Sequence, residues 1–285
     1  MSVSAAGLVA LLDLEHIDDT LFRGQQSETD RQRVFGGQVA AQALVAATRT
    51  VDAEFVVHSL HSYFLLPGDT AVPIVYDVER LRDGRSFATR RVVARQHGRP
   101  IYFQTASFQR HEEGFEHQDR MPDVPDPSEA LDMVELMRRS GNEDADALAK
   151  EWAALEARYV GNSRFNMPED PDHPSRARMW IRVGEGLGDD PQVHRAAFTY
   201  ASDIGLLDAA LAAHDVTPAD VQMASLDHAI WFHRPFRADD WWLYDMQSPS
   251  AQGARGLALA KVFTADGRLV ATAAQEGLIR PRRDH

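Results

Sequence analysis

The sequence predicts an α+β fold built from two tandem repeats, in which each repeat wraps an antiparallel sheet around one central helix. Three observations support this prediction. An Ala-rich helical segment is followed by a series of β-like segments, the second half of the chain repeats that order, and short sequence matches recur between the halves at a nearly constant offset. Self-similarity of this kind indicates an internal duplication.

The first repeat begins with two helical segments. Residues 5–14 have the pattern of a short amphipathic helix, and residues 36–50 are rich in Ala, with apolar residues at helical spacing. Because the second segment is apolar along its length, we expect it to be buried on several sides. Gly36 and Gly37 at its beginning form neither a dinucleotide-binding motif nor a P-loop. They indicate either close packing of the helix start against the sheet or a free helix N-terminus that could bind an oxyanion.

Four β-like segments follow this helix. Turns that contain glycine separate them, as in Pro67-Gly68-Asp69 and Asp83-Gly84-Arg85. Long successive strands joined by tight turns predict an antiparallel sheet. The predicted strands cover residues 55–66, 71–82, 86–97 and 100–109.

The middle of the chain differs in character, because it is acidic and rich in Pro. Residues 128–139 and 143–159 have helical patterns, and Ser128 is a plausible start for the first of them. We expect a structured connection with exposed loops. The predicted division is a first repeat, a connecting segment and a second repeat at residues 1–110, 111–178 and 179–285.

The second half repeats the order of the first. A β-like segment at 179–184 precedes helical segments at about 192–213, and four predicted strands follow at residues 220–234, 241–249, 254–265 and 268–279. Three matches connect the halves: FGGQV at 35–39 with YASDI at 200–204, YFLLP at 63–67 with WFHRP at 231–235, and GRPI at 98–101 with GRLV at 267–270. A buried helix enclosed by a curled sheet, present twice in one chain, is a double hotdog.

Composition and charge exclude several classes of protein. The chain has 285 residues and a formal net charge of −13, so it has no general attraction for nucleic acid or for an anionic membrane. The absence of cysteine excludes disulfides, thiol catalysis, thiolate zinc sites and iron–sulfur clusters. The sequence has neither a signal-peptide pattern at its start nor an apolar run long enough to span a membrane, so we expect a cytoplasmic protein without membrane insertion.

The histidines do not form a metal-binding pattern. His58 and His61 are three residues apart in a predicted strand, and His228 and His233 are five apart, so each pair points to opposite faces of the sheet. No HExxH motif is present. We therefore expect no metal and no redox cofactor. For His58, we expect a structural role.

Longer stretches carry a resemblance to a known family. They are LFRGQ (21–25), VFGGQV (34–39), HSLHSYFLLPGD (58–69), PIVYDVERLRDGRSF (73–87), ASFQ (106–109), GFEHQ (114–118), YASD (200–203), SLDHAIWFHRPF (225–236), ARG (254–256) and QEGLIR (275–280). Through them the chain resembles the acyl-CoA thioesterase II family, which are double-hotdog hydrolases of acyl-CoA thioesters. The resemblance runs from about Leu11 to Arg280 and is weakest in the middle segment.

The resemblance implies a substrate, a reaction and three site residues. The family's carboxylate corresponds to Asp203 in YASD, its hydroxyl to Ser225, where many relatives have Thr, and its amide to Gln275 in QEG. It implies hydrolysis of acyl-CoA to free fatty acid and CoA by an activated water, and a role in fatty acid and lipid metabolism. CoA is then part of the substrate, and no further cofactor is implied. Families of this fold usually assemble, so we expect a homo-oligomer.

Each of these residues also has an ordinary structural interpretation. Asp203 precedes an apolar run, so it is either an acid that stabilises a helix start or a general base for water; its counterpart in the first repeat is Gln38. Ser225 lies in a strand-like run without the G-x-S-x-G pattern of a nucleophile elbow. Gln275 is either a polar residue at a sheet edge or an N–H donor that polarises the thioester carbonyl or holds a water. Its counterpart falls near Ala106.

Two other functions compete with thioester hydrolysis. A hotdog enoyl-CoA hydratase has an Asp followed five residues later by His, whereas Asp203 is followed by Asp208, so that pattern fails. A non-catalytic acyl-CoA-binding module would have no use for a general base, and Asp203, Ser225 and Gln275 are all present. Release of a free thiol from acyl-CoA distinguishes the three functions.

Overall fold

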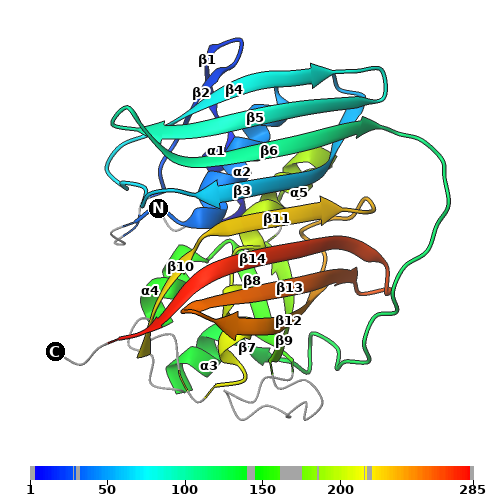
Figure 1. The fold of residues 1–285 in the computed structure, drawn as a ribbon. Coiled ribbons are helices and arrows are strands. Elements are labelled where there is room, and N and C mark those ends of the chain that lie inside the picture. The colour runs from blue at the N-terminus through cyan, green and yellow to red at the C-terminus, as the bar shows by residue number, and fades with distance from the viewer. Residues whose placement is uncertain are drawn as a thin grey trace.

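The computed structural model describes residues 4–27, 29, 33–139, 145–160, 175–184, 186–214, 216 and 220–282. Within these ranges the strands form one continuous antiparallel sheet of 14 strands, and the central helices lie behind it in Figure 1. The first half of the chain contributes α1 (Ala5–Leu12), β1 (Glu15–Asp18), β2 (Leu21–Gly24), α2 (Gly36–Thr48), β3 (Phe55–Phe64), β4 (Ile74–Asp83), β5 (Phe87–Gln96) and β6 (Arg99–Arg110).

The remaining elements belong to the connection and the second half. The connection contains β7 (Leu131–Asp132), α3 (Met133–Arg139), α4 (Ala145–Glu151) and β8 (Leu155–Tyr159). The second half contains β9 (Arg176–Val183), α5 (Pro191–Ala201), the 3₁₀-helix η2 (Leu207–Leu211), β10 (Val221–Ser225), β11 (Asp227–Phe232), β12 (Trp242–Gln252), β13 (Arg255–Thr264) and β14 (Leu269–Pro281). The division at residues 110 and 178 stays a prediction.

The strand order shows the duplication directly. The sheet runs β1-β2-β4-β5-β6-β3-β11-β14-β13-β12-β9-β8-β7, and β10 also pairs with β14. The order β2-β4-β5-β6-β3 in the first half therefore corresponds to β9-β12-β13-β14-β11 in the second. Each set of strands curves around one central helix, α2 or α5 (Figure 1). The predicted double hotdog is confirmed.

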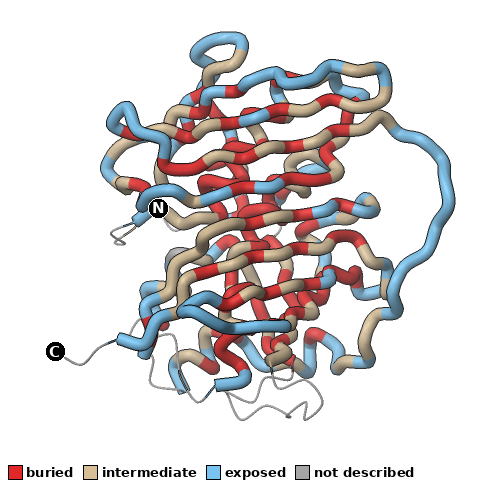
Figure 2. Tube along the Cα trace, viewed as in Figure 1, coloured by how far each residue is buried: buried red, intermediate tan, exposed pale blue. Residues whose placement is uncertain are grey.

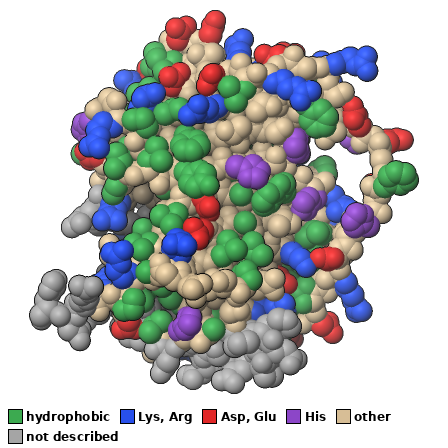
Figure 3. Space-filling model, viewed as in Figure 1, with side chains coloured by type: hydrophobic (Ala, Val, Ile, Leu, Met, Phe, Trp, Pro, Cys, Tyr) green, Lys and Arg blue, Asp and Glu red, His purple; other side chains and the backbone are tan. Residues whose placement is uncertain are grey.

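The two halves meet where β3 pairs with β11. Leu60 lies opposite Ile230 in this pair, and both side chains are buried. On the outer face, the rings of His61 and Trp231 pack edge to face with their centroids 5.0 Å apart. Figure 3 shows this outer face, where hydrophobic side chains lie among charged ones. The junction between the halves is thus stabilised by backbone hydrogen bonds and by side-chain contacts on both faces of the sheet.

Helix α2 is buried on several sides, as its composition predicts. Ten of its 13 residues are buried. In Figure 2 the trace of this helix, behind the sheet, is mostly in the colour of buried residues. Its polar residue Gln42 is satisfied inside the core, because its Nε2 donates to the backbone oxygens of Leu11 and Gln25 and its Oε1 accepts from the hydroxyl of Tyr76. The many alanines let neighbouring elements approach closely, and burial of the helix supplies much of the core.

The first turn of α2 packs against the last turn of α5. A Cβ added to Gly37 would overlap the backbone carbonyl oxygen of Tyr200, and the rings of Phe35 and Tyr200 pack edge to face at 5.0 Å. The opposite ends of the two helices also face each other, since Thr48 and Gln192 line one hollow. The two central helices are therefore antiparallel neighbours. Gly37 serves the contact with α5, whereas Gly36 packs against Phe64 of β3, as the predicted contact of the helix start with the sheet requires.

The expectation that Asp203 begins a helix is wrong. Helix α5 begins at Pro191, whose predecessor Asp190 caps it by accepting from the Gln192 N–H at 2.9 Å. The helix ends at Ala201, and Gly205 beyond it adopts φ +72°, a conformation that ends helices. The match of FGGQV with YASDI therefore pairs the start of α2 with the end of α5, and Gln38 is not the structural counterpart of Asp203.

The predicted helices of the connection are partly wrong. The first begins at Met133 instead of 128, because Asp132 accepts a hydrogen bond from the Glu135 N–H. Residues 155–159 of the second form strand β8, since their backbone pairs with β9. Leu, Glu, Ala and Arg in this segment favour a helix, and tertiary pairing overrides that preference. Strands β1 and β2 were not predicted. No helix within the described ranges is long and apolar enough to cross a membrane.

The contact between α2 and α5 predicts the effect of one methyl group. Gly37→Ala should lower the free energy of unfolding by about 1–3 kcal/mol, because the new Cβ has to displace backbone in a tightly packed contact. Urea denaturation measures this. Gly114→Ala is the matched control, since no atom lies within 4 Å of the added Cβ there, and it should leave the midpoint unchanged. Equal midpoints for both variants would contradict the close contact.

Candidate active site

The structure brings Asp203, Ser225 and Gln275 together, although they are distant in the sequence. The side-chain Nε2 of Gln275 donates to Oδ1 of Asp203 at 2.7 Å and to Oγ of Ser225 at 3.0 Å. Gln275 is buried, whereas Asp203 and Ser225 are partly exposed. The carboxylate, the hydroxyl and the amide therefore form one hydrogen-bonded cluster. Their catalytic roles stay a prediction.

The local fold explains how each side chain reaches the cluster. Gln275 lies on the inward face of β14, where alternate residues are buried. Ser225 ends β10, which pairs with the same strand and places Ser225 opposite Gly277. Asp203 follows Ser202, the C-cap residue of α5, so it lies just beyond the end of the helix. Strand β14 therefore carries Gln275 and, through its pairing with β10, also positions Ser225.

Both amide hydrogens of Gln275 are used within the cluster. A carboxylate accepts hydrogen bonds but cannot donate them, so the amide nitrogen, not the oxygen, faces Asp203. With its second hydrogen on Ser225, the amide has none left for a thioester carbonyl in this arrangement. The expected role of Gln275 as a direct donor to the substrate therefore lacks support here, and its observed role is to orient the acid and the hydroxyl.

The N-terminus of α2 lies beside the acid. A Cβ on Gly36 would stand 2.7 Å from Oδ2 of Asp203, so only glycine allows this approach. The residue before the helix, Phe35, makes no side-chain capping hydrogen bond. The N–H groups of Gln38 and Val39 donate to the backbone oxygen of Phe35, so those of Gly36 and Gly37 are the ones that lack an acceptor within the helix. The helix dipole adds partial positive charge at this end. The first half thus supplies N–H donors to a site whose acid comes from the second half.

A cavity of about 350 Å³ opens onto Asp203 and Ser225. Apolar side chains of both halves form its walls, and Asp203 and Arg33 are the charged residues among those that the structure places there. The lining residues are Arg33, Val34, Gly36, Val39, Phe64, Leu65, Leu66, Pro67, Gly68, Ile101, Tyr102, Asp203, Met223, Ala224, Ser225 and Leu226. A mostly apolar cavity with a few converging polar groups is typical of a small-molecule site.

Two buried tyrosines stand near the acid. Burial raises the pKa of Tyr102, and the negative charge of Asp203 raises it further. Burial likewise raises the pKa of Tyr244, again with a contribution from Asp203. Both phenols therefore stay protonated and act as donors, Tyr102 to Oε1 of Gln104 and Tyr244 to the backbone oxygen of Ser202.

His58 and His233 are structural in this arrangement. Nε2 of His58 lies 2.9 Å from Oγ of Ser107, burial lowers the pKa of His58, and the residue does not line the cavity. His233 contacts Thr272 on the other side of the sheet. In the part of the chain that the structure describes, no group of three or more His, Cys, Asp or Glu residues could hold a metal ion.

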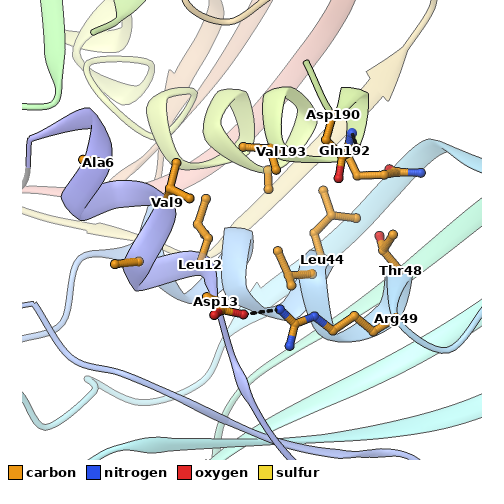
Figure 4. Close-up of a pocket in the computed structure, with 13 residues that line it drawn as sticks. Ala6, Val9, Leu12, Asp13, Leu44, Thr48, Arg49, Asp190, Gln192 and Val193 are labelled. Atoms are coloured by element: carbon orange, nitrogen blue, oxygen red, sulfur yellow. Dashed lines mark hydrogen bonds and ion pairs between the residues drawn. The ribbon is translucent and has the colours of Figure 1, made fainter. Parts of the chain in front are cut away.

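A larger hollow, of about 500 Å³, lies at the other ends of the two central helices (Figure 4). Its charged residues are already engaged in the fold: Arg49 pairs with Asp13 at 2.7 Å, and Asp190 caps α5. It contains none of the three clustered residues. The smaller cavity beside Asp203 is therefore the candidate active site.

Several parts of this site were missed from the sequence. Phe64, Tyr102 and Arg33 line the cavity and come from the first half. The N-terminus of α2 is not among the missed parts, since the sequence predicts it as a possible oxyanion site, and Gly36 does line the cavity. Ser202 and His228, which form a buried hydrogen bond next to Asp203, were also missed. Most of these residues lie in stretches that carry the family resemblance, but residue type alone does not tell which side chains face the cavity.

Comparisons with known proteins agree with this fold and site. The family profile described as acyl-CoA thioesterase matches residues 165–278, and the one described as acyl-CoA thioesterase N-terminal domain matches residues 25–109. The chain is 40% identical to acyl-CoA thioesterase 2 of Haemophilus influenzae over 98% of this chain and 99% of that protein. It is 39% identical to human acyl-coenzyme A thioesterase 8 over 96% of this chain and 88% of the relative.

Solved structures give the same result. The crystal structure of acyl-CoA thioesterase II TesB2 from Mycobacterium marinum superimposes with a TM-score of 0.83 at 43% identity, covering 98% of this chain and 100% of that one. A hot dog fold protein of unknown function from Alicyclobacillus acidocaldarius has a TM-score of 0.80 at 21% identity, covering 97% and 98%, and supports the fold alone. With relatives this similar along nearly its whole length, the chain belongs to the acyl-CoA thioesterase II family of thioester-hydrolysing enzymes.

Proposed function

We propose that the chain hydrolyses acyl-CoA thioesters to free fatty acid and CoA by direct attack of a water molecule bound at Asp203 and Ser225. The observation that carries this proposal is the hydrogen bonding of one buried amide to both an acid and a hydroxyl at the wall of an apolar cavity. The amide of Gln275 orients the acid and the hydroxyl. The acyl chain occupies the apolar part of the cavity.

The reaction requires one base, one place for negative charge and one proton donor. Asp203 takes a proton from the water as the water oxygen attacks the thioester carbonyl carbon. The resulting oxyanion lies near the first turn of α2, where free N–H groups and the hydroxyl of Ser225 stabilise it. Collapse of this intermediate breaks the C–S bond, and the proton on Asp203 passes to the CoA sulfur. No step in this scheme requires a metal or redox cofactor.

The two competing functions are less well supported. A hydratase of the Asp/His type needs a histidine beside its acid, and none of the described residues that line the cavity is a histidine. A non-catalytic acyl-CoA-binding module does not agree with membership of an enzyme family. Release of CoA followed with a thiol reagent tests all three, and the protein contributes no background because it has no cysteine. A homo-oligomer in the cytoplasm stays an expectation.

Asp203→Asn should lower kcat by at least about 10²-fold with a modest change in KM, because it removes the base and preserves the size of the side chain. Steady-state thiol release measures both constants. Asp77→Asn, an exposed residue on β4, is the control and should match the wild type. Near-normal turnover of a folded Asp203→Asn protein would remove Asp203 from the mechanism.

The role of Ser225 distinguishes direct attack by water from covalent catalysis. If its hydroxyl only donates a hydrogen bond, Ser225→Thr should keep most of the activity, and Ser225→Ala should be slowed by about tenfold, the value of one hydrogen bond. Intact-mass measurement after rapid quench should find no acylated protein. An acyl adduct that maps to Ser225 would establish a covalent intermediate and contradict direct hydrolysis.

Gln275→Glu should shift the pH dependence of kcat. A second carboxylate beside Asp203 disfavours ionisation of both, so the apparent pKa of the pair rises and the base is available only at higher pH. We expect the acidic limb of the kcat profile to move up by about one pH unit or more. Gln222→Glu, at an exposed position on β10, adds the same charge and should leave the profile in place. An unmoved limb in Gln275→Glu would show that this amide does not face the base.

A further inference from the structure

Ser202 and His228 form a buried pair directly beside the acid. Nε2 of His228, on β11, lies 2.9 Å from Oγ of Ser202, which is the C-cap residue of α5 and precedes Asp203. Both side chains are almost completely buried, at 0% and 1% exposed. The reaction scheme uses neither of them. His228 does not line the cavity, so its influence on the reaction would have to pass through Ser202.

The hydrogen bonds determine which nitrogen of His228 carries the proton. Oγ of Ser202 lies 3.0 Å from the backbone oxygen of Thr199, which can only accept, so the single hydroxyl proton goes there. Nε2 of His228 must then carry its own proton and donate it to Oγ of Ser202. Burial lowers the pKa of His228 to about 4, which keeps the ring neutral near pH 7. Nδ1 has no hydrogen-bond partner among the residues that the structure describes.

Packing alone does not explain a histidine at this position. Strand β3 corresponds to β11 in the repeat, and the match of YFLLP with WFHRP aligns Leu60 with His228. Leu60 is fully buried, so the fold accepts leucine at the equivalent inward position. A buried imidazole with an unpaired nitrogen costs free energy that leucine would not. Among the residues that the structure describes, the side chain of His228 makes one hydrogen bond, and it goes to Ser202.

The turn that carries Asp203 is held from several strands. The hydroxyl of Tyr244, on β12, donates to the backbone oxygen of Ser202 at 2.8 Å. The hydroxyl of Ser62, on β3, donates to the backbone oxygen of His228 at 2.7 Å and ties the histidine to the other half. Gln275 holds the carboxylate itself. His228 thus supplies the side-chain anchor of the residue before the base.

We propose that His228 is a positioning residue, whose Nε2–H fixes Ser202 and thereby places Asp203 for proton abstraction. This inference rests on the proposed role of Asp203 as the base. A displacement of about 1 Å at a reacting group can cost about 10²-fold in rate. The histidine would therefore affect kcat more than substrate binding.

The test compares His228→Leu, which copies the first repeat and removes the donor, with His228→Gln, which restores an N–H near the position of Nε2. We expect kcat of His228→Leu to fall by about 10- to 100-fold with KM changed less than about threefold, and His228→Gln to recover at least about fivefold of that loss. His194→Leu is the matched control. His194 is also buried and lies on α5, but at the opposite end, where it bonds Gly188 and Ala238. That variant should lose stability and keep kcat.

A second pair of variants separates positioning from general damage. Ser202→Ala breaks the same hydrogen bond, so it should reproduce the loss in kcat even if His228→Leu folds poorly, and the double variant should lose no more than either single one. In an Asp203→Asn background, His228→Leu should change the residual rate less than about twofold.

Two results would overturn this role of His228. One is a kcat within about twofold of wild type for both His228→Leu and Ser202→Ala, and the other is an equal loss with or without Asp203. If Asp203→Asn is inactive while His228→Leu and Ser202→Ala are active, the positioning role of His228 is contradicted and the role of Asp203 as the base is not. If Asp203→Asn is itself fully active, the proposed mechanism fails with it.

Discussion

The close contact between the first turn of α2 and the last turn of α5 is the constraint on which the rest of the molecule depends. Gly37 allows it, because any side chain would overlap the backbone of Tyr200. The contact places the N-terminus of a helix from the first half against the residues that follow a helix from the second. It therefore creates the site: Asp203 leaves α5 where the free N–H groups of α2 begin, and Gly36 allows the carboxylate to lie against them.

The sheet determines the position of the other side of the site. Strand β14 pairs with β10, β11 and β13, so the position of Gln275 is set by three neighbouring strands. From that position one amide reaches both the acid and the hydroxyl. Because both of its hydrogens are used there, the proposed mechanism assigns stabilisation of the oxyanion to other donors. It assigns this role to the N-terminus of α2, so in that mechanism each half contributes a part of the site.

The sequence predicted strands better than helix ends, for a physical reason. Strand positions are locked by register, and the predicted counterparts Ala106 and Gln275 do lie on corresponding strands, β6 and β14, at buried positions. Helix ends can move by several residues without breaking a ladder of hydrogen bonds. The alignment of Gln38 with Asp203 failed for that reason, because Asp190 and Pro191 start α5 well before the matched motif.

The clustering of Asp203, Ser225 and Gln275 followed from the family resemblance, since no local pattern in the sequence places these residues together. What sequence could not give is the direction of each hydrogen bond. The interpretation of Gln275 as a donor to the substrate was reasonable for an amide, and only its two short contacts show that both hydrogens are already in use. The contribution of Phe64 and Tyr102 to the cavity likewise depends on the curvature of the sheet, which composition does not determine.

The duplication also explains why the two halves carry different chemistry on one scaffold. At two inward positions the first half has Ala106 and Leu60, where the second has Gln275 and His228. These apolar residues pack in the first half, whereas in the second half Gln275 bonds Asp203 and His228 bonds the neighbouring Ser202. Each polar replacement carries a desolvation cost that its hydrogen bonds must offset. The polar cluster beside Asp203 is thus held by a core that is mostly apolar, and buried polar residues elsewhere, such as Gln42, form hydrogen bonds of their own.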